Sequence, residues 1–207
     1  MEIKVCGITN AHDINALKNM NINRLGFIFY DKSPRNVSDL SLEKDLKDFP
    51  SRIKKVGVFV NEEVSFIKKQ IDRFSLDAIQ LHGNESPEFC NTFKKEIEVI
   101  KAFSIKDENS LLDCSKYLDS CDYFLFDTYT PNYGGSGLNF DWSILHNYKL
   151  SKPFFLSGGI DLSSLDEIKR ISNPFLCGID VNSKFEIKPG IKDINKIHEL
   201  IKQLKIE

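Results

Sequence analysis

Short apolar runs alternate along the chain with segments whose apolar residues recur at helical spacing. The runs are continuous and rich in β-branched and aromatic side chains, which is typical of parallel strands buried on both faces. We predict eight strands, at residues 3–6, 25–29, 56–60, 78–81, 98–103, 123–127, 153–157 and 177–181.

The segments between these runs predict amphipathic helices. In residues 62–74, apolar side chains fall three or four positions apart, and the same spacing returns in residues 192–205. Residues 86–94 open with Ser86 and Pro87, which favour a helix start, and residues 162–171 follow Asp161.

Strand and helix thus alternate eight times in 207 residues, or about 26 residues for each unit. This length and order predict a small (β/α)8 TIM barrel of the α/β class, with an open doubly wound sheet as the alternative. Because no linker, low-complexity tract or strong repeat interrupts the pattern, we predict one domain over residues 1–207.

Composition narrows the class of partner. Apolar residues make up 41% and charged residues 28% of the chain, and the net charge is -2, so no basic field favours nucleic acid. No apolar run reaches the roughly 20 residues that cross a bilayer, and the first residues lack the pattern of a secretion signal. We expect neither a nucleic-acid nor a membrane partner.

The five cysteines are spread along the chain without a Cys-x-x-Cys pair. This pattern predicts neither a metal site nor a disulfide framework, and it fits a reducing cytoplasm.

Several predicted strands end in a polar residue. Cys6, His82, Asp127 and Asp180 stand at such ends, and Arg35 follows the second strand. In a (β/α)8 barrel the carboxyl ends of the strands form the catalytic face, so these residues are expected to converge. Taken singly, each also has a structural interpretation: Cys6 as a small buried residue, for example, and Arg35 as a solvated charge.

Strand alternation sharpens the expectation. If Ile3 and Val5 face the helices, Lys4 and Cys6 face the barrel interior, where the lysine charge favours a thiolate. The same parity places Asp127 inward with Leu125, and puts Gln80 and His82 on one side.

Glycines follow three consecutive strands, in loops that commonly cradle a phosphate in this barrel. No P-loop or dinucleotide fingerprint is present, so no nucleotide cofactor is expected. The candidate phosphate-binding residues are Gly135, Ser136, Gly158, Gly159, Asn182 and Ser183.

These motifs occur together, and in the same order, in one known family. Nearly the whole chain resembles phosphoribosylanthranilate isomerase of tryptophan biosynthesis. The resemblance rests on Lys4–Thr9 (KVCGIT), Ser33–Arg35 (SPR), Gln80–Gly83 (QLHG), Leu156–Gly159 (LSGG) and Pro189–Asp193 (PGIKD). The chain departs from the family at Lys184 and Phe185, where a glycine and a small aliphatic residue are usual. If that glycine has a positive φ in the family, we expect Lys184 to be strained or its loop to be remodelled.

The resemblance implies an Amadori rearrangement of N-(5-phosphoribosyl)anthranilate to 1-(2-carboxyphenylamino)-1-deoxyribulose 5-phosphate, without metal or other cofactor. It implies Asp127 as general acid, Cys6 as general base and Arg35 as the cation for the anthranilate carboxylate. Asp180 is expected to contact a sugar hydroxyl and His82 to line the pocket. The partner is a small phosphorylated substrate, and the chain is expected to be a monomer or a homodimer.

Two other functions remain open from the residues alone. Another sugar-phosphate isomerase or lyase on the same barrel would share the phosphate loops without requiring Cys6, Arg35 and Asp127 together. A non-catalytic protein that binds a phosphorylated metabolite would have no use for both proton-transfer residues.

Overall fold

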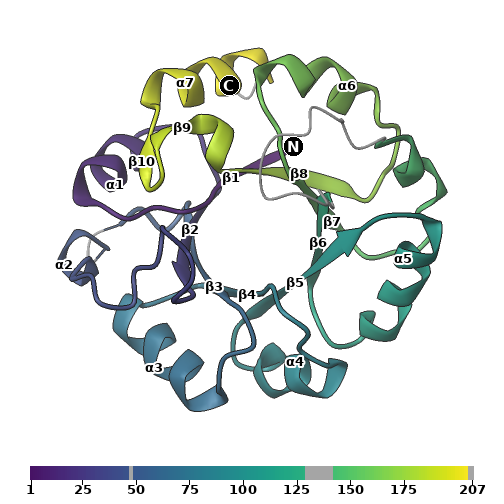
Figure 1. Ribbon diagram of the computed structural model, residues 1–207, viewed down its shortest axis with the longest axis horizontal. Helices are drawn as coiled ribbons and strands as arrows, with labels where there is room; N and C mark the ends of the chain where they lie inside the picture. The colour runs from purple at the N-terminus through teal and green to yellow at the C-terminus, as the bar shows by residue number, and fades with distance from the viewer. Residues whose placement is uncertain (47–48, 129–141, 205–207) are drawn as a thin grey trace.

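The computed structural model describes residues 1–46, 49–128 and 142–204. Eight parallel strands close into a barrel in the order β1 to β8, with the helices around the outside (Figure 1). The strands are β1 (Glu2–Val5), β2 (Arg24–Phe29), β3 (Lys54–Phe59), β4 (Ala78–Leu81), β5 (Glu98–Ile105), β6 (Tyr123–Thr128), β7 (Phe154–Ser157) and β8 (Leu176–Val181). The predicted TIM barrel is confirmed, and the open sheet is excluded because β1 pairs with β8.

The helices follow the strands. They are α1 (Ala11–Leu17), α2 (Glu43–Leu46), α3 (Val64–Phe74), α4 (Pro87–Lys94), α5 (Glu108–Asp113), α6 (Leu165–Arg170) and α7 (Ile194–Gln203). Short 3-10 helices are η1 (Cys114–Tyr117), η2 (Trp142–Asn147), η3 (Leu162–Ser164) and η4 (Ser183–Phe185). Between β6 and β7 the structure describes residues 142–153, which contain η2. None of the described helices combines the length and the apolarity needed to span a membrane.

Local signals explain where the predicted helices begin. The Ser86 side chain accepts a hydrogen bond from the Phe89 amide, and Pro87 occupies the first turn of α4. Asp161 caps η3, which leads into α6, through a reciprocal capping box with Ser164. The segment expected at 192–205 instead begins its helix at Ile194, because the two residues before Asp193 form a strand.

A small antiparallel hairpin, β9 (Glu186–Lys188) with β10 (Ile191–Lys192), follows β8 and was not predicted. Figure 1 shows it near β1, between α7 and α1. Its two strands are too short to give a periodic signal in the sequence. They nevertheless bring two charged residues, Glu186 and Lys192, over the carboxyl end of the barrel.

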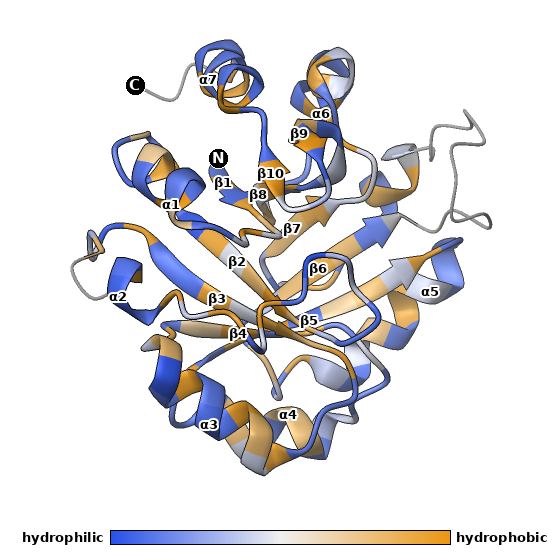
Figure 2. Ribbon diagram, turned by 60° about the vertical axis from the view of Figure 1, so that its left-hand side comes forward, coloured by the Kyte–Doolittle hydropathy of each residue, from blue (hydrophilic) through white to orange (hydrophobic). Residues whose placement is uncertain are grey.

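The core has an outer and an inner part. Outward-facing residues such as Ile3, Val5, Phe124 and Phe126 pack with the helices, as the strand alternation predicted. The inner part is a smaller cluster of Val56, Ala78, Ile100, Ala102, Leu125 and Phe155. Figure 2 shows the strands mainly orange and the helices in both colours, which matches amphipathic helices over an apolar sheet.

The amino end of the barrel is closed by Arg24, which is almost fully buried. Its guanidinium pairs with Glu2 and Glu98 and lies 4.9 Å and 5.0 Å from the ring centres of Tyr123 and Phe155. Burial of this charge is tolerated because both carboxylates and both rings surround it. The interior of the barrel at its amino end is therefore filled by the Arg24 side chain and its partners.

Candidate active site

The residues predicted at the strand ends form three contact groups at the carboxyl end of the barrel. Cys6 follows β1, and its side chain is 4% exposed. His82 and Asp127, at the ends of β4 and β6, are in contact, while Asp180 lies on β8 and pairs with a residue of β1. Arg35 comes from the loop after β2 and meets the β9–β10 hairpin.

Lys4 and Asp180 form a buried ion pair because the barrel closes between them. They are direct register partners of β1 and β8, and both point inward. The Lys4 Nζ donates to Asp180 Oδ1 over 2.9 Å, and the Ser157 hydroxyl approaches Asp180 Oδ2 at 3.4 Å. Burial alone lowers the pKa of Lys4, but Asp180 and Cys6 together raise it above its ordinary value, so Lys4 is a cation.

Cys6 lies between two buried ion pairs. Burial raises the pKa of the Cys6 thiol, Lys4 and Lys192 act in the opposite direction, and Asp180 adds to the increase. The effect of Lys4 on the thiol therefore has the expected direction, but the net pKa of Cys6 is higher than that of an ordinary cysteine. The lysine charge favours the thiolate, but the loss of hydration outweighs it.

Gly7 directly follows Cys6 and lies against the side chain of Arg35. It has a φ of +77°, and a Cβ at this position would lie 2.7 Å from Arg35 Cδ and 2.7 Å from Asn182 Oδ1. Only glycine satisfies both the backbone conformation and the close approach. The Arg35 side chain therefore passes directly beside the residue that follows Cys6.

Arg35, Glu186 and Lys192 form a partly buried charge network. Arg35 makes three hydrogen bonds of 2.5 Å to 3.1 Å with the two oxygens of Glu186. Lys192 Nζ, fully buried, donates to Glu186 Oε1 over 2.8 Å and to Asn182 Oδ1 over 2.9 Å. Two cations share one carboxylate, so the network has a net charge of +1 when all three groups are ionised. Such a cluster attracts an anion while holding the guanidinium still.

His82 and Asp127 are in contact, a pair that the expected convergence of the strand ends did not name. The His82 Nε2 lies 3.3 Å from Asp127 Oδ2, and both side chains are about one-third exposed. On the other side of the ring, Gln80 Nε2 lies 2.8 Å from His82 Nδ1. The imidazole is thus held from both nitrogens, and the carboxyl group of Asp127 remains open to solvent.

Two of the predicted phosphate-binding glycines have a backbone that favours glycine. Gly158 and Gly159 follow β7 with φ of +87° and +67°. A Cβ at Gly159 would meet no atom of the described residues within 4 Å. Ser183 starts η4, and the Asn182 Oδ1 accepts a hydrogen bond from Lys192. Gly135 and Ser136 lie outside the described residues.

The departure at Lys184 and Phe185 does not strain the backbone. Lys184 lies in η4, and the described non-glycine residues with positive φ are Asn61 and Ser75. Phe185 is fully buried in the outer core, and its amide donates to the Asn182 carbonyl. The expectation of a strained Lys184 is therefore wrong, since the loop is a helical turn anchored by Phe185.

Sequence reasoning assigned no role to Gln80, Glu186 or Lys192. Strand alternation placed Gln80 beside His82, but nothing in the sequence showed that its amide reaches the ring. Glu186 and Lys192 belong to a hairpin with no periodic signal. Lys192 belongs to the Pro189–Asp193 motif, and Glu186 directly follows the departure from the family at Lys184 and Phe185.

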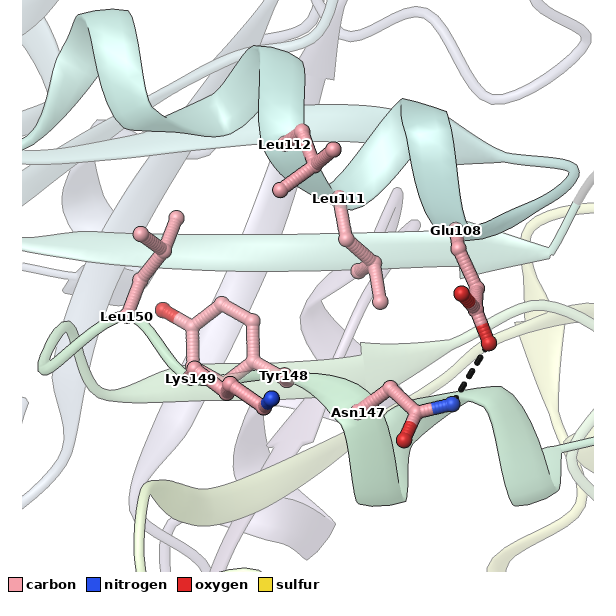
Figure 3. Close-up of a pocket in the computed structure, with 7 residues that line it drawn as sticks. All are labelled: Glu108, Leu111, Leu112, Asn147, Tyr148, Lys149 and Leu150. Carbon is pink, nitrogen blue, oxygen red and sulfur yellow. Dashed lines mark hydrogen bonds between the residues drawn. The ribbon is translucent and has the colours of Figure 1, made fainter.

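Surface pockets elsewhere do not contain these residues. The pocket in Figure 3, of about 280 Å³, lies between α5 and the segment after η2, with Glu108 and Asn147 joined across one end by a 2.5 Å hydrogen bond. A second, of about 630 Å³, lies near α3 and the start of β5. Within the described part of the chain, no group of three or more His, Cys, Asp or Glu side chains is placed to hold a metal ion.

Fold and site together define an enzyme of the (β/α)8-barrel class, with titratable side chains gathered at the carboxyl end of the barrel. The family model of N-(5'-phosphoribosyl)anthranilate isomerase matches residues 3–203. The chain belongs to this family of isomerases.

Individual relatives agree over almost the full length. The N-(5'-phosphoribosyl)anthranilate isomerase of Parabacteroides distasonis is 45% identical over 99% of this chain and 93% of its own. The crystal structure of the Thermotoga maritima enzyme superposes with a TM-score of 0.90, at 36% identity, over 99% of this chain and 98% of that one. A further isomerase structure, at 32% identity and a TM-score of 0.86 over 99% and 98% of the two chains, holds reduced 1-(o-carboxyphenylamino)-1-deoxyribulose 5-phosphate.

Proposed function

We propose that this chain isomerises N-(5-phosphoribosyl)anthranilate to 1-(2-carboxyphenylamino)-1-deoxyribulose 5-phosphate in tryptophan biosynthesis, with Asp127 as general acid and Cys6 as general base. One observation supports these two roles. The partly exposed carboxyl group of Asp127 and the thiol of Cys6, which lies near Lys4 and Lys192, stand at the same end of the barrel. Proton transfer is the whole of this chemistry, and these groups are suited to it.

The reaction proceeds by two proton transfers and a tautomerisation. Asp127 gives its proton to the furanose ring oxygen as the bond from C1 to that oxygen breaks, and the nitrogen lone pair forms a C1=N iminium. The Cys6 thiolate then takes the proton from C2, the C–H electron pair forms C1=C2, and the iminium electrons return to nitrogen. The enolamine loses its C2 hydroxyl proton and gains one at C1 to give the ketone. Asp127 ends as a carboxylate and Cys6 as a thiol, and solvent restores both.

Charge complementarity supports the binding assignments. Arg35 presents a guanidinium, held by Glu186, to the anthranilate carboxylate. Asp180 accepts from a sugar hydroxyl at the carboxyl end of β8. The phosphate rests on the backbone of Gly158, Gly159, Asn182 and Ser183 together with Gly135 and Ser136.

The proposal requires one small phosphorylated substrate and no partner macromolecule. A monomer or a homodimer satisfies it, since the described site residues come from one chain; a Thermotoga maritima relative is named as a dimeric enzyme. We place the enzyme in the cytoplasm, where its five free cysteines stay reduced.

A fluorescence assay tests the proposal. Fresh phosphoribosylanthranilate is mixed with the wild-type protein and with Asp127→Asn and Cys6→Ser, without metal or cofactor. We expect fast loss of fluorescence with wild type and a loss of roughly 10²-fold or more in rate with each variant. Asp166→Asn, on the exposed face of α6, is the matched control and keeps full activity.

A folded wild-type protein without turnover would overturn the proposal. The remaining candidates would then be another sugar-phosphate isomerase or lyase, or a binding protein. Thermal stabilisation by a panel of phosphorylated sugars separates these two, because turnover accompanies binding only in the first.

A further inference from the structure

Gln80 is a buried polar residue with no role in the proposed reaction. It lies in the middle of β4, points into the barrel and is 1% exposed. Its register partners are Val58 and Ile100, and its Oε1 has no hydrogen-bond partner among the described residues. A buried amide oxygen without a partner destabilises the folded protein, because it has lost its hydrogen bonds to water. A residue kept at that cost for stability alone would be better replaced by an apolar side chain.

The other end of the amide makes a specific contact. Gln80 Nε2 lies 2.8 Å from His82 Nδ1. An amide NH₂ can only donate, so the Nδ1 that accepts from it is unprotonated, and the single proton of the neutral ring is on Nε2. The Nε2–H points at Asp127 Oδ2, 3.3 Å away.

The contact with His82 also distinguishes the two oxygens of Asp127. A carboxylic acid has one hydroxyl, and the oxygen that accepts from an N–H is the carbonyl oxygen. Because Oδ2 accepts from His82, the proton that Asp127 delivers in the proposed reaction is carried by Oδ1. After that proton is transferred, the same His82 N–H stabilises the carboxylate that remains.

The main chain around His82 is held independently of Gln80. The His82 amide donates to the Phe59 carbonyl over 2.8 Å. The next residue, Gly83, donates to Glu85, whose carboxylate pairs with the buried Lys101 at 3.2 Å. A change at Gln80 therefore alters the proton position on the ring more than the path of the loop.

We propose that Gln80 is a positioning residue that fixes the Nε2–H tautomer of His82 and thereby presents the Oδ1 proton of Asp127 to the substrate. This rests on the proposed role of Asp127 as general acid. The assignment concerns ground-state proton positions, so it can be tested in the ligand-free protein.

The first measurement is the ¹⁵N spectrum of the histidine rings in the wild-type protein. His82→Gln identifies the signal among the four histidines. We expect an unprotonated Nδ1 and a protonated Nε2 at neutral pH. A protonated Nδ1 on a neutral ring would mean that the amide is reversed, and it would overturn the proposal. A wild-type protein without isomerase activity would overturn the proposed function, and its histidine spectrum would still test the tautomer.

The second measurement uses Gln80→Met, with Gln70→Met as matched control. Gln70 is also a buried glutamine with an unpartnered Oε1, but it lies on α3. We expect Gln80→Met to mix the two His82 tautomers and to lower kcat roughly 10-fold with KM within about twofold, because the acid acts in the transition state. Gln70→Met keeps kcat and the spectrum.

The thermal stability of Gln80→Met distinguishes a positioning role of Gln80 from a role in packing the barrel. Gln80→Met removes the unpartnered oxygen, so Tm is expected to stay equal or rise while kcat falls. A fall in Tm with unchanged kcat would assign Gln80 to the structure of the barrel and overturn the proposal. So would a single Nε2–H tautomer that persists in the variant.

Discussion

Arg35 and Glu186 are 151 positions apart in the chain, yet the guanidinium of one makes three hydrogen bonds to the carboxylate of the other. The pair joins the loop after β2 to the β9–β10 hairpin above the barrel. Through Glu186 the guanidinium is also linked to the buried Lys192. The guanidinium that we propose as the clamp for the substrate carboxylate is thus held in place before substrate arrives, which reduces the entropy lost on binding.

Arg35→Ala is expected to raise KM more than it lowers kcat. Charged hydrogen bonds are worth about 1.5–3 kcal/mol, which corresponds to an increase in KM of roughly 10- to 100-fold. Steady-state kinetics at saturating and limiting substrate measure the two constants. Arg52→Ala, whose guanidinium donates only to the carbonyls of Lys18 and Met20, is the control. A pure loss of kcat would contradict a clamp.

Glu186→Gln is expected to destabilise the protein. It leaves the buried Lys192 without its carboxylate, and breaking a buried pair costs roughly 3 kcal/mol or more. Urea denaturation measures the change. Glu96→Gln, in the exposed pair with Lys68, serves as control and shifts stability by less than about 1 kcal/mol. The double change Glu186→Gln with Lys192→Met should recover part of the loss; no recovery would show that Lys192 is not the cause.

The carboxylate of Glu186 is also expected to make the free energy of unfolding depend on pH in the acid range. Burial alone raises the pKa of Glu186, but Arg35 and Lys192 lower it below its ordinary value of 4.5. A lowered folded-state pKa contributes stability that is complete above 4.5 and is lost as pH falls through the folded value. Wild-type unfolding free energy should therefore fall below pH 4.5 more steeply than that of Glu186→Gln. Parallel curves would contradict the lowered pKa.

The reactivity of Cys6 is expected to increase with pH through the neutral and mildly alkaline range. Burial raises the pKa of the Cys6 thiol above its ordinary value, so the thiolate is scarce at neutral pH and increases about tenfold with each pH unit. The rate of iodoacetamide labelling at Cys6, measured against pH, checks this. A labelling rate that stays constant between pH 7 and 9 would contradict a raised pKa of the Cys6 thiol.

Lys184→Gly is expected to lower stability by about 0.5–1 kcal/mol. Lys184 lies in the helical turn η4 without a positive φ, so glycine brings only the entropy cost of a more flexible unfolded chain. Thermal or urea unfolding measures the difference. A gain in stability would indicate strain at Lys184 after all.

Much of the fold could be predicted from the sequence because a strand has a side-chain period of two and a helix one of 3.6 residues. The eight apolar runs are the eight strands, with ends shifted by one or two residues. The same period placed Lys4 and Asp127 inward, whereas their contacts with Asp180 and His82 appear only in the structure. Such local rules hold wherever a strand is regular up to its last residue.

Other features depended on contacts between distant segments. The partner of Arg35, the hairpin that carries it and the amide on His82 arise only when the barrel closes and its loops pack together. The pKa of Cys6 is of this kind as well, since the residue type supplies a thiol but burial decides its charge. The sequence by itself determined which groups face the barrel interior, through the alternation of each strand. Only the tertiary structure decided which of them touch and which are ionised, because hydrogen bonding and desolvation are set by neighbours far away in the chain.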